Sequence, residues 1–396
     1  MSRIIRNSIF NIPEGSILPI VATSQVVPMP LVLEVTISQY LLDNYPSVDI
    51  IIPHQHDDGL GLGNNYNFDY LLDFGDGSEV VHVTSYNDVK CSHSYTVAGV
   101  YDISITGVCE NIDVTANTAF GSALTSIISW GTINFKAISF AGQVTLASIP
   151  TDTYGAFKDI TSFANAFSLT GITSIPDGLL NYCTNVTSFS NTFNQCVITT
   201  IPLGLFDNCP LVTDFSGVFN SYALTSIPAG LFDKCINVTT FHNTFLGCLG
   251  ITTIPTGLFD HCPLVTDFSG VFSQCSALTM IPTGLFDHCP AVTDMSSAFY
   301  YNSITEIPTG LFDGFISVTD FTSVFSGSQV LTSIPATLFD TCVSAVNFTT
   351  AFAYSMLIAG NAPELWVTFP SATGTSCFTN CFALTNLSDA QTAGWA

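Results

Sequence analysis

Ile-Pro pairs recur at a nearly constant spacing along most of this chain. They end at Pro150, Pro176, Pro202, Pro228, Pro255, Pro282, Pro308 and Pro335, so that successive pairs lie 26 or 27 residues apart. A period of this length predicts a solenoid, in which each repeat buries its apolar positions only by stacking on its neighbours. Solenoids usually present an extended surface rather than a closed pocket, and we therefore expect a non-enzymatic protein.

The composition excludes several classes of partner. Apolar residues make up 47% of the 396 residues and charged residues only 9%, which is typical of a folded chain rather than a disordered one. Thirty acidic residues against six basic ones give a net charge of −24, so nucleic acid and anionic membranes are not expected partners. No apolar run reaches the roughly 18 to 20 residues of a spanning helix, and Asn7, Asn11 and Pro13 interrupt any signal-peptide core.

Within one repeat, apolar residues three apart indicate short extended segments. Val265 and Phe268 form one such pair, and Leu278 and Ile281 form another. We expect short parallel strands, one rung per repeat, with Pro282 at a strand end because it lacks an N–H to donate. Stacked rungs would place like residues in columns, and one phenylalanine column is predicted to form the core: Phe193, Phe219, Phe245, Phe272, Phe299, Phe325 and Phe352.

The repeat cysteines fall into two columns. Because Phe315 stands in the first column and Tyr222 in the series of the second, both are predicted to be buried apolar columns of free thiols. A zinc site is not expected, since C-x-x-C pairs are absent. The first column contains Cys183, Cys209, Cys235, Cys262, Cys289 and Cys342, and the second contains Cys196, Cys248 and Cys275.

Aspartates also repeat, and two interpretations of the first aspartate column remain open. Its carboxylates either accept backbone N–H groups in a turn or share calcium ions, because like charges at rung spacing otherwise repel. The column contains Asp207, Asp233, Asp260, Asp287, Asp313 and Asp340. A second column (Asp214, Asp267, Asp294 and Asp320) also admits Ser188 and Thr240, and this variability predicts exposure.

The position after the first aspartate changes in almost every repeat. Its occupants are Asn208, Lys234, His261, His288, Gly314 and Thr341. A solenoid keeps its buried positions uniform and leaves its solvent positions free to vary. Lys234, His261 and His288 are therefore candidate partner-binding residues, with neutral drift as the open alternative.

The region before the repeats alternates with period two, which predicts β-strands. The segment from Leu31 to Ser38 is the clearest case. His54, His56, Asp57 and Asp58 lie in a glycine-rich loop, which is either a metal site or, as we favour, a solvated polar loop. The sequence Asp73-Phe74-Gly75-Asp76-Gly77 predicts a tight hairpin turn with both glycines at positive φ.

The DFGDG segment, His93-Ser94-Tyr95 and the stretch from Gly99 to Ile105 together resemble the polycystic-kidney-disease (PKD) domain, an immunoglobulin-like β-sandwich. The resemblance covers about residues 30–109, with Phe74 where tryptophan is commoner. It implies a structural module without an active site. Cys91 and Cys109 lie near the ends of neighbouring predicted strands, where a disulfide between them is one option.

The repeats resemble leucine-rich-repeat-like surface proteins of mycoplasma and gut bacteria, a type also carried by phages. The segments from Val292 to Phe299 and from Ser276 to Thr279 carry the resemblance, which spans residues 123 to about 352. It implies a mainly β protein with a right-handed leucine-rich-repeat-like solenoid, and a role in adhesion to a host-surface protein or glycan.

We expect three parts: an N-terminal arm (1–30), an immunoglobulin-like β-sandwich (31–115) and the solenoid with irregular caps (116–396). The arm contains Arg3, Arg6, Ile9 and Phe10, a basic and apolar set that would dock on other subunits of an oligomer or larger assembly. The predicted function is a bacteriophage virion surface protein, located on the virion, and the alternative is a secreted bacterial cell-surface adhesin.

Overall fold

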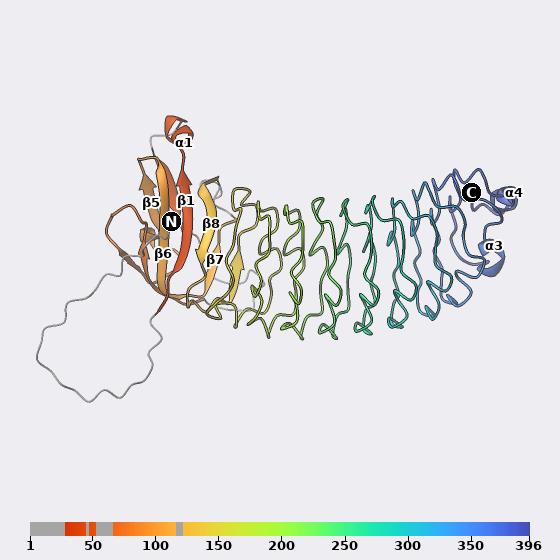
Figure 1. Ribbon diagram of the computed structural model, residues 1–396, viewed down its shortest axis with the longest axis horizontal. Helices are drawn as coiled ribbons and strands as arrows, with labels where there is room; N and C mark the ends of the chain where they lie inside the picture. The colour runs from red at the N-terminus through yellow and green to blue at the C-terminus, as the bar shows by residue number, and fades with distance from the viewer. Residues whose placement is uncertain (1–27, 45–46, 53–65, 116–121) are drawn as a thin grey trace, which may run out of the picture.

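The computed structural model describes residues 28–44, 47–52, 66–115 and 122–396. A β domain lies at the N-terminal end and a long stack of rungs extends from it to the C-terminus, which gives an elongated molecule (Figure 1). The described residues are mainly β and turn, with few and short helices. The predicted solenoid is confirmed.

A five-stranded antiparallel sheet forms the larger layer of the β domain. Its order is β4-β3-β6-β1-β8, and its strands are β1 (Leu31–Ile37), β3 (Phe68–Asp73), β4 (Val81–Val83), β6 (Gly99–Cys109) and β8 (Leu124–Ser129). Every second residue of β1 is buried, as the alternation in the sequence predicts. A second sheet pairs β2 (Val48–Ile51) with β5 (Ser92–Tyr95); α1 (Gln39–Asn44) and the 3₁₀ turn η1 (Val89–Cys91) lie in the connections.

The residues that resemble the PKD family meet in one cluster. β3 and β4 form the expected hairpin, with Gly75 and Gly77 at φ of 75° and 88°. The ring of His93 stacks on Phe74 at 4.5 Å, and the Tyr95 hydroxyl donates to the Phe74 carbonyl at 2.6 Å. These contacts tie the two sheets together, while the assignment to the PKD or immunoglobulin type stays a prediction.

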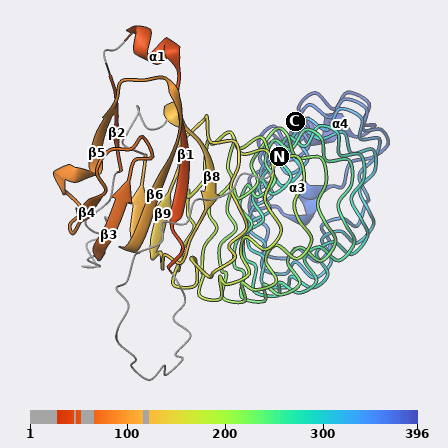
Figure 2. The same ribbon diagram turned by 60° about the vertical axis from the view of Figure 1, so that its left-hand side comes forward.

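The β domain and the solenoid share backbone pairing. β8 pairs antiparallel with β1, and its residue Ser126 also forms a parallel bridge to Ser148 in the next rung. β7 (Asn111–Asp113) pairs in parallel with β9 (Ala137–Ser139). Pairing thus crosses the expected boundary at 115/116 twice, and the segment expected to be a solenoid cap is an edge strand of the β domain (Figure 2).

The rungs pair in parallel, but less extensively than expected. From Ser162 to Thr373, isolated parallel bridges connect one residue of each rung to the next, instead of short strands. Most rungs contain three residues with left-handed φ, such as Gly257 at 74°, Gly270 at 63° and Gln274 at 60°. These residues turn the chain so often that a longer strand cannot form.

Stacked phenylalanines fill the solenoid. The predicted column extends from Phe167 to Phe378, with centroids of successive rings 5.4 to 6.2 Å apart and planes within 18° of parallel. A second column includes Phe189, Phe215 and Phe241, and a third passes through Phe232. All are buried, so the inward assignment of the predicted column is confirmed.

The C-terminal end is closed by an irregular cap, as expected. It contains two short helices, α3 (Leu365–Thr368) and α4 (Leu387–Thr392), which lie at the far end of the stack (Figure 1). Trp395 is buried there, and its ring lies 5.8 Å from that of Phe348. Its carbonyl accepts the N–H of Phe378, so the chain end seals the last rung.

Candidate functional surface

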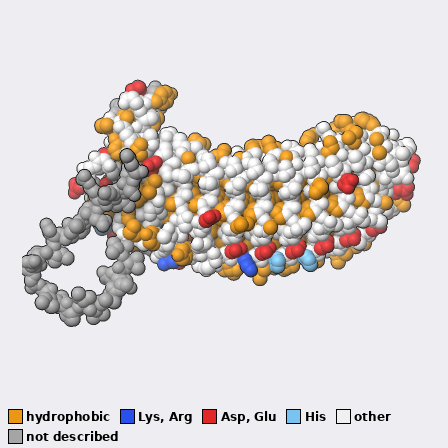
Figure 3. All heavy atoms as spheres, viewed as in Figure 1, with side chains coloured by type: hydrophobic (Ala, Val, Ile, Leu, Met, Phe, Trp, Pro, Cys, Tyr) orange, Lys and Arg blue, Asp and Glu red, His pale blue; other side chains and the backbone are white. Residues whose placement is uncertain are grey.

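The first aspartate column forms a row of carboxylates along one side of the solenoid (Figure 3). Five of the six aspartates end a tight turn whose glycine has positive φ; the Asp287 N–H, for example, donates to the Gly284 carbonyl at 3.2 Å. In the sixth turn, Thr337 replaces the glycine and its carbonyl accepts the Asp340 N–H at 3.2 Å. A Cβ added to Gly284 would lie 3.0 Å from Asp287 Oδ2, so the carboxylate lies over the glycine. In the five glycine turns, the carboxylate therefore lies beside a residue without a side chain, and the aspartate points outward.

Neither interpretation of this row is supported by the contacts. Among the described residues, no backbone N–H donates to these six carboxylates, so they are not capping groups. A polar hollow of about 410 Å³ lies between Asp287 and Asp313. However, no group of three or more His, Cys, Asp and Glu side chains in the described part of the chain gathers closely enough to hold a metal ion. Calcium binding by this row stays a prediction.

The variable position lies directly beside the carboxylates. Lys234, His261 and His288 are exposed, as predicted for partner-binding candidates, and Figure 3 shows cationic and histidine side chains along the acidic row. His261 Nδ1 lies 3.4 Å from Asp233 Oδ1 of the preceding rung. This contact joins two rungs at the surface; whether these residues bind a partner stays a prediction.

An apolar ridge is formed by residues that come shortly after the variable position in the sequence of most repeats. It was not predicted from the sequence. It consists of large side chains one or two residues after the first cysteine column, each 47 to 74% exposed: Leu211, Ile236, Leu264, Ile316 and Val343. Exposed apolar atoms accompany the carboxylates in Figure 3. We call the six aspartates together with this ridge the acidic edge. The ridge is interrupted in the rung of Cys289, where Ala291 occupies the position. Exposed apolar patches are typical of interaction surfaces.

The second aspartate column is not exposed, contrary to the expectation. Its residues are half-buried on the bridge line, where Asp267 Oδ1 accepts the Ser269 N–H at 2.8 Å. Thr240 donates to Asp267 Oδ2 at 3.3 Å from the preceding rung. Serine or threonine fits this position because a hydroxyl also accepts the N–H two residues later, and the variability therefore reflects shared turn chemistry.

All thirteen cysteines belong to the described chain, where each is buried and unpaired. Cys91 and Cys109 are thus separate thiols, and Cys91 contacts the Tyr70 hydroxyl at 3.5 Å. Burial raises the pKa of Cys262 to about 12 and that of Cys342 to about 12. Thiols held protonated in this way are poor nucleophiles, which favours a packing role.

The second cysteine column is not simply apolar, and this corrects the prediction. Cys275 Sγ lies 3.1 Å from the Phe245 carbonyl of the preceding rung, and in the next rung Asn302 Nδ2 donates to the Phe272 carbonyl at 3.1 Å. The position therefore supplies a hydrogen-bond donor. Tyr222, which was placed in this series, is 68% exposed; Ser221 is the buried residue.

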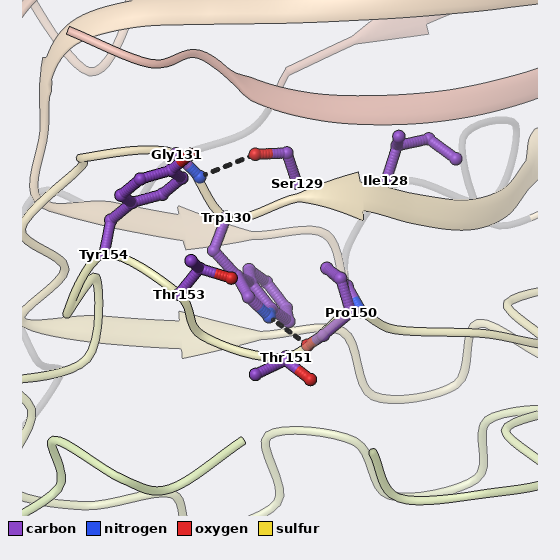
Figure 4. Close-up of a pocket in the computed structure, with 8 residues that line it drawn as sticks. All are labelled: Ile128, Ser129, Trp130, Gly131, Pro150, Thr151, Thr153 and Tyr154. Atoms are coloured by element: carbon purple, nitrogen blue, oxygen red, sulfur yellow. Dashed lines mark hydrogen bonds between the residues drawn. The ribbon is translucent and has the colours of Figure 1, made fainter. Parts of the chain in front are cut away.

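A small pocket of about 260 Å³ lies at the junction of the β domain and the solenoid (Figure 4). Several of its polar groups bond within the protein: Trp130 Nε1 donates to the Pro150 carbonyl at 2.8 Å, and the Gly131 N–H to Ser129 Oγ at 3.0 Å. Thr151 donates to the Asp177 carbonyl at 2.7 Å. These contacts hold the junction together.

Two groups of predicted site residues lie outside the described residues: His54, His56, Asp57 and Asp58, and the arm residues Arg3, Arg6, Ile9 and Phe10. The described end of the arm contacts the junction, where the Met29 N–H donates to Thr132 Oγ1 at 3.1 Å. Within the described residues, no helix is long and apolar enough to cross a bilayer.

No family model matches the sequence, and a search of curated proteins finds no match. Solved structures with some similarity include InlJ of Listeria monocytogenes (14% identity, TM-score 0.34, covering 68% of this chain and 58% of that one). The Drosophila Toll–Spatzle complex matches at 16% identity and a TM-score of 0.33, over 64% of this chain and 39% of that one. The LRR ectodomain of Arabidopsis thaliana GASSHO1/SCHENGEN3 matches at 14% identity and a TM-score of 0.25, over 66% of this chain and 38% of that one. This chain thus spans less than two thirds of each solved chain, and at these scores the fold assignment rests on the rung geometry.

Proposed function

We propose that this chain is a non-enzymatic adhesion protein on the surface of a bacteriophage virion. Its N-terminal part anchors it to other subunits, and its solenoid presents the acidic edge to a partner on the host surface. The observation that carries the proposal is the edge itself, in which six consecutive rungs each present a carboxylate and five of them also present a large exposed apolar side chain three or four residues later. Such a surface fits a partner with basic and apolar groups.

The shared pairing at the junction supports a presenting role. Because β8 belongs to both the β-domain sheet and the first rung contacts, the solenoid is attached through backbone hydrogen bonds rather than through a flexible linker. A solenoid held in this way would project in a fixed direction from whatever anchors the N-terminal part. The alternative is a secreted bacterial adhesin of the leucine-rich-repeat type, which would use the same edge.

Removing charge from the edge tests its role. We would replace Asp260, Asp287 and Asp313 with asparagine and measure attachment of the purified protein to host cells at several salt concentrations. Attachment should weaken, and its salt dependence should flatten, because fewer charges are screened. The matched control changes three exposed carboxylates elsewhere, Asp43→Asn, Glu79→Gln and Glu306→Gln, to the same net charge. Equal attachment by both triple variants contradicts the role of the edge.

The anchor and the location require a different experiment. Residues 1–27 would be deleted, leaving Met29 to contact Thr132. We expect the truncated protein to fold but to lose association with purified virions, measured by sedimentation and immunogold labelling. Normal association of the truncated protein would remove the arm from the proposal. Labelling of the bacterial envelope instead of virions would favour the secreted adhesin.

A further inference from the structure

A second hollow, of about 350 Å³, lies away from the acidic edge, on the turn that follows the main phenylalanine column. It is lined by Leu249, Gln274, Ser276, Tyr300 and Tyr301, which come from three successive rungs. Two rung spacings of about 4.8 Å make it about 10 Å long. Its volume falls at the lower end of the range for small-molecule sites.

Two tyrosine rings form one wall of the hollow. The ring centroids of Tyr300 and Tyr301 lie 4.5 Å apart, and Tyr301 is 45% exposed. The backbone of Tyr301 has φ of 54°, and the equivalent residues of other rungs, such as Gly247, Gln274 and Asn380, also have positive φ. Gly327 of the next rung makes room for the ring, since a Cβ there would lie 2.6 Å from it. The aromatic wall thus depends on a large residue, Tyr301, in one rung and a glycine, Gly327, at the equivalent position of the next rung.

The polar side chains of the hollow are available for a ligand. Within the described chain, the Gln274 amide, the Ser276 hydroxyl and the two phenol hydroxyls form no hydrogen bond with other protein groups. Burial raises the pKa of Tyr300, so its phenol stays a donor at neutral pH. Donors, acceptors and aromatic faces are therefore present together, without a charged side chain in the lining.

We propose that this hollow binds a neutral sugar unit of a glycan, with Tyr301 as the stacking platform and Gln274 and Ser276 bonding to sugar hydroxyls. A pyranose has an apolar face of C–H groups that suits the negative face of an aromatic ring, and a rim of hydroxyls that both donate and accept. Anionic sugars are disfavoured, because the lining lacks cations and the chain carries a net charge of −24. The proposal rests on the adhesive role but concerns a surface separate from the acidic edge.

Affinity electrophoresis tests this inference with neutral polysaccharides (dextran, mannan, galactomannan and a β-glucan) and with anionic polygalacturonate as the comparison. We expect at least one neutral polymer to retard the protein, and polygalacturonate not to. Tyr301→Asn should weaken that binding by about tenfold, or about 1.4 kcal/mol, because it removes the stacked ring. Asparagine fits the backbone there, since Asn380 occupies the equivalent position at φ of 64°.

The matched control is Tyr222→Ala. Tyr222 is likewise exposed and lies over a glycine of the next rung, Gly247, but outside the hollow. The Tyr222→Ala protein should bind the polymer as the unchanged protein does. The Gln274→Gly protein should bind more weakly; glycine is tolerated there, since Gly247 occupies the equivalent position of the preceding rung. Absence of retardation by every neutral polymer overturns the inference, as does an equal loss in the Tyr222 and Tyr301 variants. Neither result affects the acidic-edge experiment, so failure of the sugar site is distinguishable from failure of adhesion.

Discussion

The β domain and the solenoid are stabilised in different ways, although they share a strand. In the β domain, contacts that each occur only once join the sheets; His93 and Asp76, 2.7 Å apart, are an example. In the solenoid, the same contact recurs in every rung between residues about 26 positions apart, as between Phe245 and Phe272. Loss of one residue should therefore affect the β domain through a unique contact and the solenoid through two neighbouring interfaces.

The largest expected effect comes from opening the phenylalanine column. Phe272 is fully buried, with its ring 5.5 Å from Phe245 and 5.9 Å from Phe299. Phe272→Ala should lower the free energy of unfolding by about 3 to 5 kcal/mol, because it leaves a cavity between two rungs. Calorimetry measures the change, and the exposed His261→Ala, expected to be nearly neutral, is its control. Equal melting temperatures would contradict the inside and outside assignments.

The next effect concerns the junction of the two regions. Gly131 has φ of 67°, and a Cβ on it would lie 2.5 Å from the Met29 carbonyl oxygen. We expect Gly131→Ala to destabilise the protein by about 1 to 3 kcal/mol and to uncouple unfolding of the β domain from that of the first rungs. Gly142→Ala is a matched control, with φ of 78° and open space around it. Hydrogen exchange measured during denaturation distinguishes unfolding of the β domain from that of the first rungs. A similar loss of stability in both variants would argue against the close approach of Gly131 to Met29.

A smaller effect should distinguish the chemistry of the second cysteine column from simple packing. Cys275→Ser keeps a donor for the Phe245 carbonyl, while Cys275→Ala leaves that buried oxygen without one. We expect the alanine variant to be less stable than the serine variant by about 1 kcal/mol in urea unfolding. Serine occupies this position natively in Ser355, which donates to the Phe325 carbonyl at 3.1 Å. If alanine is the more stable of the two, the column is apolar after all.

The smallest effect concerns the β domain, where one carboxylate contributes stability that is lost in acid. Hydrogen bonds from Ser78, with a contribution from His93, lower the pKa of Asp76 from 3.8 to about 2. The resulting stabilisation is present above about pH 4 and is lost as the pH falls through about 2. Asp76→Asn should lower the melting temperature at neutral pH and reduce its fall between pH 4 and 2. Glu79→Gln, an exposed change in the same loop, is the control; an unchanged acid profile in the Asp76 variant would contradict the contribution.

The sequence alone determined the solenoid, its period and its inward residues, because a residue type that recurs in every rung reports the environment of its whole column. It also predicted the glycine turn at Gly75 and Gly77, since φ above zero restricts residue choice locally. Both inferences depend on short-range or repeated information.

Only the tertiary structure decided the features that occur once in the chain or that are built from variable residues of neighbouring rungs. The sharing of β8 between two regions depends on pairing with β1, about 90 residues earlier, and no repeat signals it. The apolar ridge and the Tyr300–Tyr301 hollow were missed because their residues vary between repeats and meet only across the stack. The half-buried Asp267 was misplaced for a related reason: a position that accepts aspartate, serine and threonine varies as an exposed one does, although its hydrogen bonds lie partly inside.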